Sequence, residues 1–256
     1  MMRAIYLQAI GEYTRFRRVI PWLLLAAFGA FGAYMWAAFS KESVPVDRYS
    51  MVSYMLVFRI TGFSAVFFAT ANVTAEVEQR TIVYLLTRPV PRWMLLVARY
   101  FAAVTVVSAI GLIAALAVSA AAFGGNPFVN PLLGKDMLAL VLGAFAYSGA
   151  FVLVSVVFPT RAMIICLLYV FGWEGLVPNM PGTMYYLSIF SHLQAIAQHP
   201  IKSDTNPLIS FLASMTGTNT LSASVSVPVL ILIPVATVVA AAAWFTHFEF
   251  LPRDDD

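Results

Sequence analysis

The feature that most constrains the fold is a series of long stretches without charged side chains. Residues 20–39, 100–123, 137–158 and 225–248 contain no Asp, Glu, Lys or Arg, and residues 49–75 contain only Arg59. A helix of about 20 apolar residues crosses the roughly 30 Å hydrocarbon core of a bilayer. A soluble domain has about a quarter of its residues charged, whereas this chain has 11% charged and 61% hydrophobic residues. The pattern predicts an all-α membrane protein.

A sixth apolar run is shorter, because Glu174 interrupts it after Trp173 and prolines follow at positions 178 and 181. We count it as the fifth of six transmembrane helices and the least regular of them. Residues 1–256 then form a single transmembrane domain. Its six spans are predicted at about 19–39, 50–75, 93–123, 136–158, 161–178 and 225–248.

The positions of lysine and arginine predict the orientation, since both residues are enriched in cytoplasmic segments. With the N-terminus in the cytoplasm, the outer segments hold only Lys41, Arg48, Lys135 and Lys202. The inner segments hold Arg3, Arg15, Arg17, Arg18, Arg80, Arg88, Arg92, Arg99, Arg161 and Arg253. We therefore predict a multi-pass protein of the cell membrane, inner or plasma, with both termini in the cytoplasm.

Two segments outside the spans are predicted to contact the membrane surface. Residues 1–18 combine apolar side chains with arginines, which favours an interfacial helix against anionic lipid headgroups. Residues 179–224 form a long outer segment that contains apolar stretches at 184–197 and 208–215. These stretches are too short to span the membrane, so we expect re-entrant or interfacial helices there.

The largest inner loop has the pattern of a short amphipathic helix. Ile82, Leu85 and Leu86 recur at helical spacing, and acidic residues precede them, where they favour the helix dipole. Pro89 then ends the helix, because proline cannot continue the hydrogen-bond ladder. From periodicity alone, a passive turn lying on the membrane is the favoured interpretation of this loop.

Two charged residues are predicted to lie inside the membrane. Counted along the helices, Arg59 lies roughly 13 Å and Glu174 roughly 11 Å below the outer surface. A lone charge at such a depth costs about 2.5–3.5 kcal/mol, so a partner is expected. We hypothesise that the two residues face each other or one polar cavity, in which case exchanging their charges should restore assembly. The alternative is that Arg59 extends outward to the headgroups and Glu174 is exposed beyond a short fifth span.

No pattern of catalytic or metal-binding residues is present. The sequence has no phosphate-binding loop, no zinc-protease motif, no nucleophile elbow and no C-x-x-C. His192 and His199 would share a helix face, but two histidines without a third ligand are weak evidence for a metal. Cys166 is interpreted as a small buried hydrophobic residue. We expect no metal, no cofactor bound by this chain and no intrinsic enzyme activity.

The inner loop resembles the first cytoplasmic loop of ABC type-2 transporter permeases. Members of that family have acidic residues, a Thr, a Leu-Leu pair, a Pro and an Arg before the third span. Residues 168–176 (LYVFGWEGL) resemble the Trp-Glu segment of the fifth span in one branch. Arg80 departs from the family, in which a glycine commonly precedes the threonine. The residues that the resemblance assigns to ATPase coupling are Glu76, Glu78, Arg80, Thr81, Leu85, Leu86, Pro89 and Arg92.

The resemblance implies a permease of an ATP-driven transporter, with export as the expected direction. Its partners would be two cytoplasmic ATPase subunits, which bind ATP and Mg, and a second permease copy, as a homodimer or with a close relative. Membrane lipids would surround it, and nucleic acid is not expected. Residues 76–87 would be a coupling helix seated in a groove of the ATPase. The transport path would run between the two permeases along spans two and five, near Arg59 and Glu174.

Three other classes of function compete with this interpretation. A secondary transporter or channel not driven by ATP usually carries several acidic residues inside the membrane, whereas Glu174 is the sole candidate here. A membrane-embedded enzyme lacks a catalytic constellation. A structural subunit that transports nothing is compatible with the sequence. Co-purification with an ATPase would separate the first interpretation from these three.

Overall fold

The computed structural model describes residues 2–40, 43–71, 91–179, 184–199 and 221–247, and these residues form helices without any strand. The long helices are α2 (Phe16–Phe39), α7 (Arg92–Ala122), α8 (Leu133–Val157) and α13 (Ala223–His247). The second span is continuous but composite, with α3 (Pro45–Val52), a π-helical turn (Ser53–Val57) and α4 (Phe58–Thr70). The predicted all-α membrane fold is confirmed.

Five helices within the described ranges are long and apolar enough to cross a membrane: Phe16–Phe39, Pro45–Thr70, Trp93–Ala122, Leu133–Val157 and Ala223–Thr246. The predicted fifth span is the shorter apolar helix Ala162–Leu176. It consists of α9 (Ala162–Leu168), a π-helical turn (Tyr169–Trp173) and α10 (Glu174–Leu176). The second span begins at Pro45 rather than near residue 50, because a proline in the first helical turn is compatible with helix initiation.

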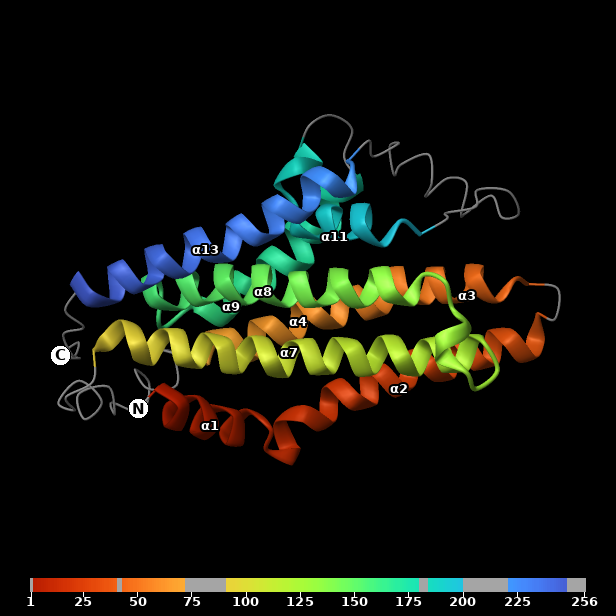
Figure 1. Ribbon diagram of the computed structural model, residues 1–256, viewed down its shortest axis with the longest axis horizontal. Coiled ribbons are helices and arrows are strands. Elements are labelled where there is room, and N and C mark those ends of the chain that lie inside the picture. Colours follow the sequence, from red (N-terminus) through yellow and green to blue (C-terminus); the bar gives the residue numbers. More distant parts are fainter. Residues whose placement is uncertain (1, 41–42, 72–90, 180–183, 200–220, 248–256) are drawn as a thin grey trace.

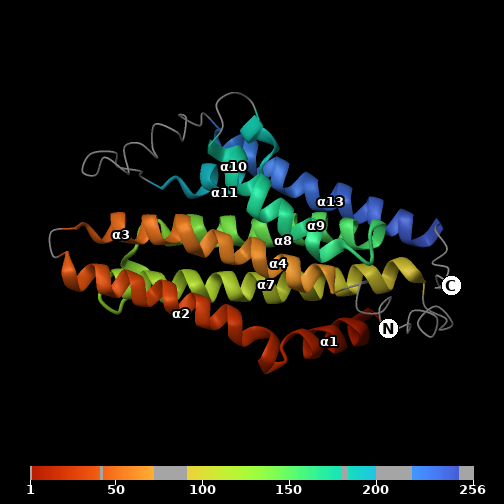
Figure 2. The ribbon, with the colours of Figure 1, turned by 180° about the vertical axis from the view of Figure 1, so that it is seen from behind.

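The helices pack in layers along a common direction (Figures 1 and 2). Helices α4, α7 and α8 form the centre, with α2 packed on α7 and α13 packed on α8. The end of α4, the start of α7 and the end of α13 lie at one end of the bundle. The end of α2 and the starts of α3 and α8 lie at the other, which the charge distribution predicts to be the outer end.

Helices α8 and α13 approach each other closely at Gly149. A Cβ atom added at Gly149 would lie 2.9 Å from the backbone of Pro234 and 2.7 Å from the hydroxyl of Thr237. Glycine is therefore required at this position for the two backbones to approach, as is typical of membrane helix interfaces. Pro234 frees a carbonyl within α13, and membrane helices tolerate this when other groups compensate.

Helix α1 (Met2–Tyr13) packs along α7 and is separated from α2 by a break at Thr14 and Arg15. The hydroxyls of Tyr6 and Thr105 lie 2.9 Å apart and join the two helices, and the ring of Tyr13 packs against Phe68. A helix is thus present within residues 1–18, and its position at the membrane interface stays a prediction. The predicted coupling helix at 76–87 and the apolar stretch 208–215 lie outside the described residues.

In the described part of the outer segment, a short helix organises the polar contacts. Helix α11 (Ile189–Ala197) follows a 3₁₀ turn at Met184–Leu187 and packs on both α8 and α13. Its side chains Phe190, His192 and Leu193 are buried. The predicted apolar helix at 184–197 is therefore present, embedded against the bundle.

Candidate functional site

Glu174 is 1% exposed and binds the N-terminus of α11. Its carboxylate accepts hydrogen bonds from the backbone N–H groups of Ile189 and Phe190, both at 3.0 Å. It also accepts from the hydroxyls of Ser188 at 2.6 Å and Tyr169 at 2.7 Å. The first N–H groups of a helix lack partners within the helix and carry the positive end of its dipole. A buried carboxylate is the complementary group, so Glu174 caps α11 from a different helix.

Arg59 lies beside this cap on the second span. Its Nη1 donates to the backbone carbonyl of Glu174 at 2.9 Å, and its guanidinium lies 4.1 Å from the ring centroid of Phe190. The first contact ties α4 to α10, and the second is a cation–π contact with α11. These two contacts hold the guanidinium in place, which argues against the alternative in which the side chain extends outward to the headgroups.

The structure thus brings Arg59 and Glu174 together, but not as a pair of opposite side-chain charges. The guanidinium donates to the Glu174 carbonyl, while the carboxylate is occupied by four other donors. Burial of Glu174 excludes the alternative in which it is exposed beyond a short span. Since an arginine at position 174 could not accept those four hydrogen bonds, we no longer expect a charge exchange to restore assembly. The proposed role of both residues in a transport path stays a prediction.

Each of the two charged residues follows a π-helical turn. The turn Ser53–Val57 ends two residues before Arg59, and the turn Tyr169–Trp173 ends directly before Glu174. A π turn holds an extra residue, which rotates the following side chains relative to those before it, and such turns are frequent at functional sites. Two independent helices therefore deviate from α-helical geometry at the point where their polar groups meet.

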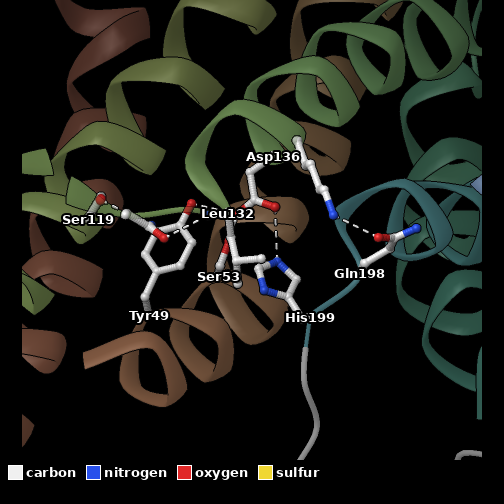
Figure 3. A network of polar contacts seen from close by, with 9 residues as sticks. Tyr49, Ser53, Ser119, Leu132, Asp136, Gln198 and His199 are labelled. Atoms are coloured by element: carbon white, nitrogen blue, oxygen red, sulfur yellow. Dashed lines mark hydrogen bonds and ion pairs between the residues drawn. The ribbon is translucent and has the colours of Figure 1, made fainter. Parts of the chain in front are cut away.

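A second buried carboxylate, Asp136, lies near the start of α8 and is fully buried (Figure 3). Its Oδ2 accepts from the hydroxyl of Tyr49 at 2.5 Å and from that of Ser53 at 3.2 Å. Its Oδ1 lies 3.1 Å from Nε2 of His199, a contact that becomes an ion pair when the imidazole is protonated. The approach is outside hydrogen-bond geometry, and Nδ1 of His199 is buried without a hydrogen-bond partner. Two separate segments, the second span and the residues after α11, therefore converge on this one carboxylate.

A second contact joins the start of α8 to the segment after α11. Nζ of Lys135 donates to Oε1 of Gln198 at 2.7 Å, so consecutive residues of α8 hold consecutive residues after α11. Gln198 has φ of 52° and is the one non-glycine residue with positive φ among the described residues. A left-handed glutamine is strained and persists only where its surroundings hold it. In the same network, Asn130 fixes the turn before α8 by bonding Ser119 and the backbone N–H of Leu132.

Sequence reasoning found Arg59 and Glu174 because each interrupts an apolar run, but it missed Asp136 and Tyr49. Asp136 follows Lys135 at the start of a predicted span, where a charged residue is ordinarily solvated, so no signal distinguished it. His199 was considered only as a weak metal ligand. The polar residues of α3 were counted as the boundary of the second span.

The structure gives no support to a metal site within the residues it describes, where no cluster of three His, Cys, Asp or Glu side chains occurs. Nδ1 of His192 lies 3.1 Å from the Ser226 hydroxyl, and its Nε2 lies 3.0 Å from the Tyr186 carbonyl. This histidine is therefore a satisfied core residue. Cys166 is a buried free thiol, as expected of a small apolar residue.

Most of the residues assigned to ATPase coupling lie outside the described residues: Glu76, Glu78, Arg80, Thr81, Leu85, Leu86 and Pro89. The remaining one, Arg92, is the first residue of α7. Their role stays a prediction. The end of α4 and the start of α7, which flank this segment, lie at the end of the bundle opposite the start of α8 (Figures 1 and 2). This is the end predicted to face the cytoplasm.

Comparison with known proteins identifies the family. The model of the ABC-2 family transporter proteins matches residues 5–250, which include all six predicted spans, Arg59, Glu174 and the α11 segment. No curated protein matches the chain. Since the match extends over nearly the whole sequence, the resemblance to ABC type-2 transporter permeases is confirmed. The chain is a multi-pass membrane protein that belongs to the ABC-2 transporter family, as the permease component of an ABC transporter.

Proposed function

We propose that this chain is the permease of an ATP-driven exporter, in which separate ATPase subunits supply the energy. The observation that carries the proposal is the family match over residues 5–250. The sequence adds two supports: the chain lacks a phosphate-binding loop of its own, and its arginines gather in the segments predicted to be cytoplasmic.

In this mechanism, the amphipathic segment 76–87 docks in a groove of the ATPase by its apolar side chains, with Leu85 as an anchor. Closure of two ATPase subunits on ATP and Mg displaces the segment. Pro89 and Pro91 pass the displacement to the second and third spans, which move as rigid bodies. A second permease copy completes the transport path.

The test is attachment and transport in a reconstituted complex. The Leu85→Asp variant places a charge in the docking helix, and we expect at least about tenfold weaker co-purification of the ATPase and loss of ATP-dependent transport. Phe128→Asp is the matched control, since Phe128 is 78% exposed in the loop at the opposite end of the bundle. This control should retain the attached ATPase.

Two results would overturn the proposal. One is that Leu85→Asp binds the ATPase as tightly as the unmodified chain. The other is that cargo moves down an ion gradient in vesicles that contain the permease without any ATPase, which would identify a secondary transporter or channel.

A further inference from the structure

The guanidinium of Arg59 has hydrogen-bonding capacity that its contacts in the protein do not use. Nη1 donates to the Glu174 carbonyl, and the structure records no acceptor for Nε or Nη2 among the described residues. Arg59 is partly exposed, and neither of its unpaired donors is fully buried. One edge of a fixed, planar cation is therefore available at the surface of the second span.

Glu174 does not provide the missing partner. Its two oxygens are occupied by two backbone N–H groups and two hydroxyls, and it is 1% exposed. The positive end of the α11 dipole is occupied by the same carboxylate, which leaves it unavailable to another anion. Of the two residues predicted to line a path, only Arg59 is free to contact a ligand.

The surface around Arg59 is apolar. Phe63 follows Arg59 by four residues within α4, where side chains at this spacing share a helix face, and Met55 precedes Arg59 within the π-helical turn. Met55 is exposed, and the ring of Phe63 packs at a tilt against that of the exposed Phe171 of the fifth span, with ring centroids 4.5 Å apart. A fixed cation in apolar surroundings is expensive inside a bilayer and marks a functional site by default.

We propose that Arg59 binds the anionic headgroup of an amphiphilic cargo, whose alkyl chain lies on the apolar surface of Met55, Phe63 and Phe171. An arginine fork offers two parallel N–H groups to a phosphate or carboxylate, and this geometry gives both strength and selectivity for anions. The cation–π contact with Phe190 helps to hold the guanidinium in place. The identification of the ligand as cargo rests on the proposed function, whereas the binding of an anion by Arg59 does not depend on it.

Binding is tested on the permease alone, in nanodiscs of phosphatidylcholine. Three photoreactive probes share one diazirine-bearing alkyl chain and differ in the head: a phosphate, an alcohol or an amine. Mass spectrometry maps the labelled peptides. We expect the alkyl phosphate to label the peptides that contain Met55–Phe63 and Phe171 at least about tenfold more than the alcohol, and the amine least, because a charge-assisted contact adds selectivity of that order.

Variants then assign the selectivity. Arg59→Gln should reduce labelling by the phosphate probe to the level of the alcohol, and Arg59→Lys should keep part of it, since it retains charge without the fork. The matched control is Arg161→Gln at the opposite end of the fifth span, which should leave the preference unchanged. Thermal unfolding shows whether each variant is folded. If Arg59→Gln does not fold, the labelling of Arg59→Lys tests the site instead. Equal labelling by the three probes, or a preference that survives in Arg59→Gln, overturns the site.

A second arm separates cargo from a resident membrane lipid. In the complex with the ATPase, the alkyl phosphate should stimulate ATP hydrolysis several-fold, and Arg59→Gln should abolish the stimulation without reducing attachment of the ATPase. Labelling without stimulation would show a bound lipid and overturn the assignment as cargo. If no ATPase attaches at all, the proposed function fails, and the labelling result on the permease alone still decides whether Arg59 binds an anion.

Discussion

The two ends of α11 are held by two buried carboxylates that work in different ways. At the N-terminus, Glu174 accepts from backbone N–H groups that have no other acceptor within the helix. At the C-terminus, Asp136 receives hydroxyls and an imidazole, and the adjoining Gln198 is in a strained backbone conformation. The first connection uses backbone N–H groups, whose direction is fixed by the helix, whereas the second uses side chains that can rotate to other partners. We infer that the N-terminus of α11 is a fixed anchor and its C-terminus a breakable one.

The largest effect is expected when the fixed anchor is removed. Glu174→Ala leaves two buried N–H groups without an acceptor, and each such group costs about 1–3 kcal/mol, so the free energy of unfolding should fall by about 3–5 kcal/mol. Glu174→Gln keeps one acceptor oxygen and should lose about half as much. Thermal unfolding in detergent measures the loss, and hydrogen exchange should locate it in the first turn of α11. An Ala variant as stable as the unmodified chain would refute the anchor.

A smaller loss is expected at the other carboxylate. Asp136→Ala should cost about 2–3 kcal/mol, because the Tyr49 and Ser53 hydroxyls lose their acceptor but can rotate to other partners. Hydrogen exchange should increase in the last turn of α11 and leave the first turn protected. If both turns open equally, α11 is one unit and the two ends are not distinct.

The contribution of His199 separates packing from polar contact. Its ring packs against those of Phe58 and Tyr49, with centroids 5.8 Å and 6.0 Å apart. His199→Phe keeps this packing and should cost about 1 kcal/mol or less, whereas His199→Ala should cost about 2 kcal/mol, since it also leaves a cavity. Equal losses in the two variants, measured by the same unfolding assay, would assign the whole effect to the contact with Asp136.

The smallest expected effect concerns the strain in Gln198. Gln198→Gly relieves the left-handed conformation by about 1 kcal/mol but loses the exposed contact with Lys135, so its net effect should be near zero. In a Lys135→Ala background that contact is already absent, and the same substitution should stabilise the protein by about 0.5–1 kcal/mol. A double-mutant cycle of the four proteins measures this difference, and additivity would show that the two residues do not interact.

The fold was largely predictable because apolar length is a strong signal. Five of the six predicted spans are helices of the expected type, and the interruption by Glu174 correctly marked the irregular one. The sequence placed the boundary between the interfacial helix and the first span near residue 18, whereas the break lies at Thr14 and Arg15. Nothing in the sequence of residues 49–57 indicates a π turn, because its extra residue is stabilised by contacts between helices.

The candidate site was predictable only in part, for a physical reason. A charged residue within an apolar run is conspicuous, and this revealed Arg59 and Glu174. The partner of a buried carboxylate can be a backbone group, as at Ile189 and Phe190, and a backbone group has no sequence signature. The same limit hid Asp136, whose partners come from residues 87 and 83 positions away along the chain.

The π turn in the second span sets the relation between the two polar regions. Tyr49 and Ser53, which contact Asp136, precede or begin this turn, and Arg59 follows it. Removing one residue between Ser53 and Val57 would restore α-helical geometry and turn Arg59 by about 100° about the helix axis relative to Tyr49. The guanidinium would then no longer lie over Phe190. The one extra residue of the π turn therefore sets the direction of Arg59 relative to Tyr49. Relatives that lack this residue would need a different position of the span to supply the cation.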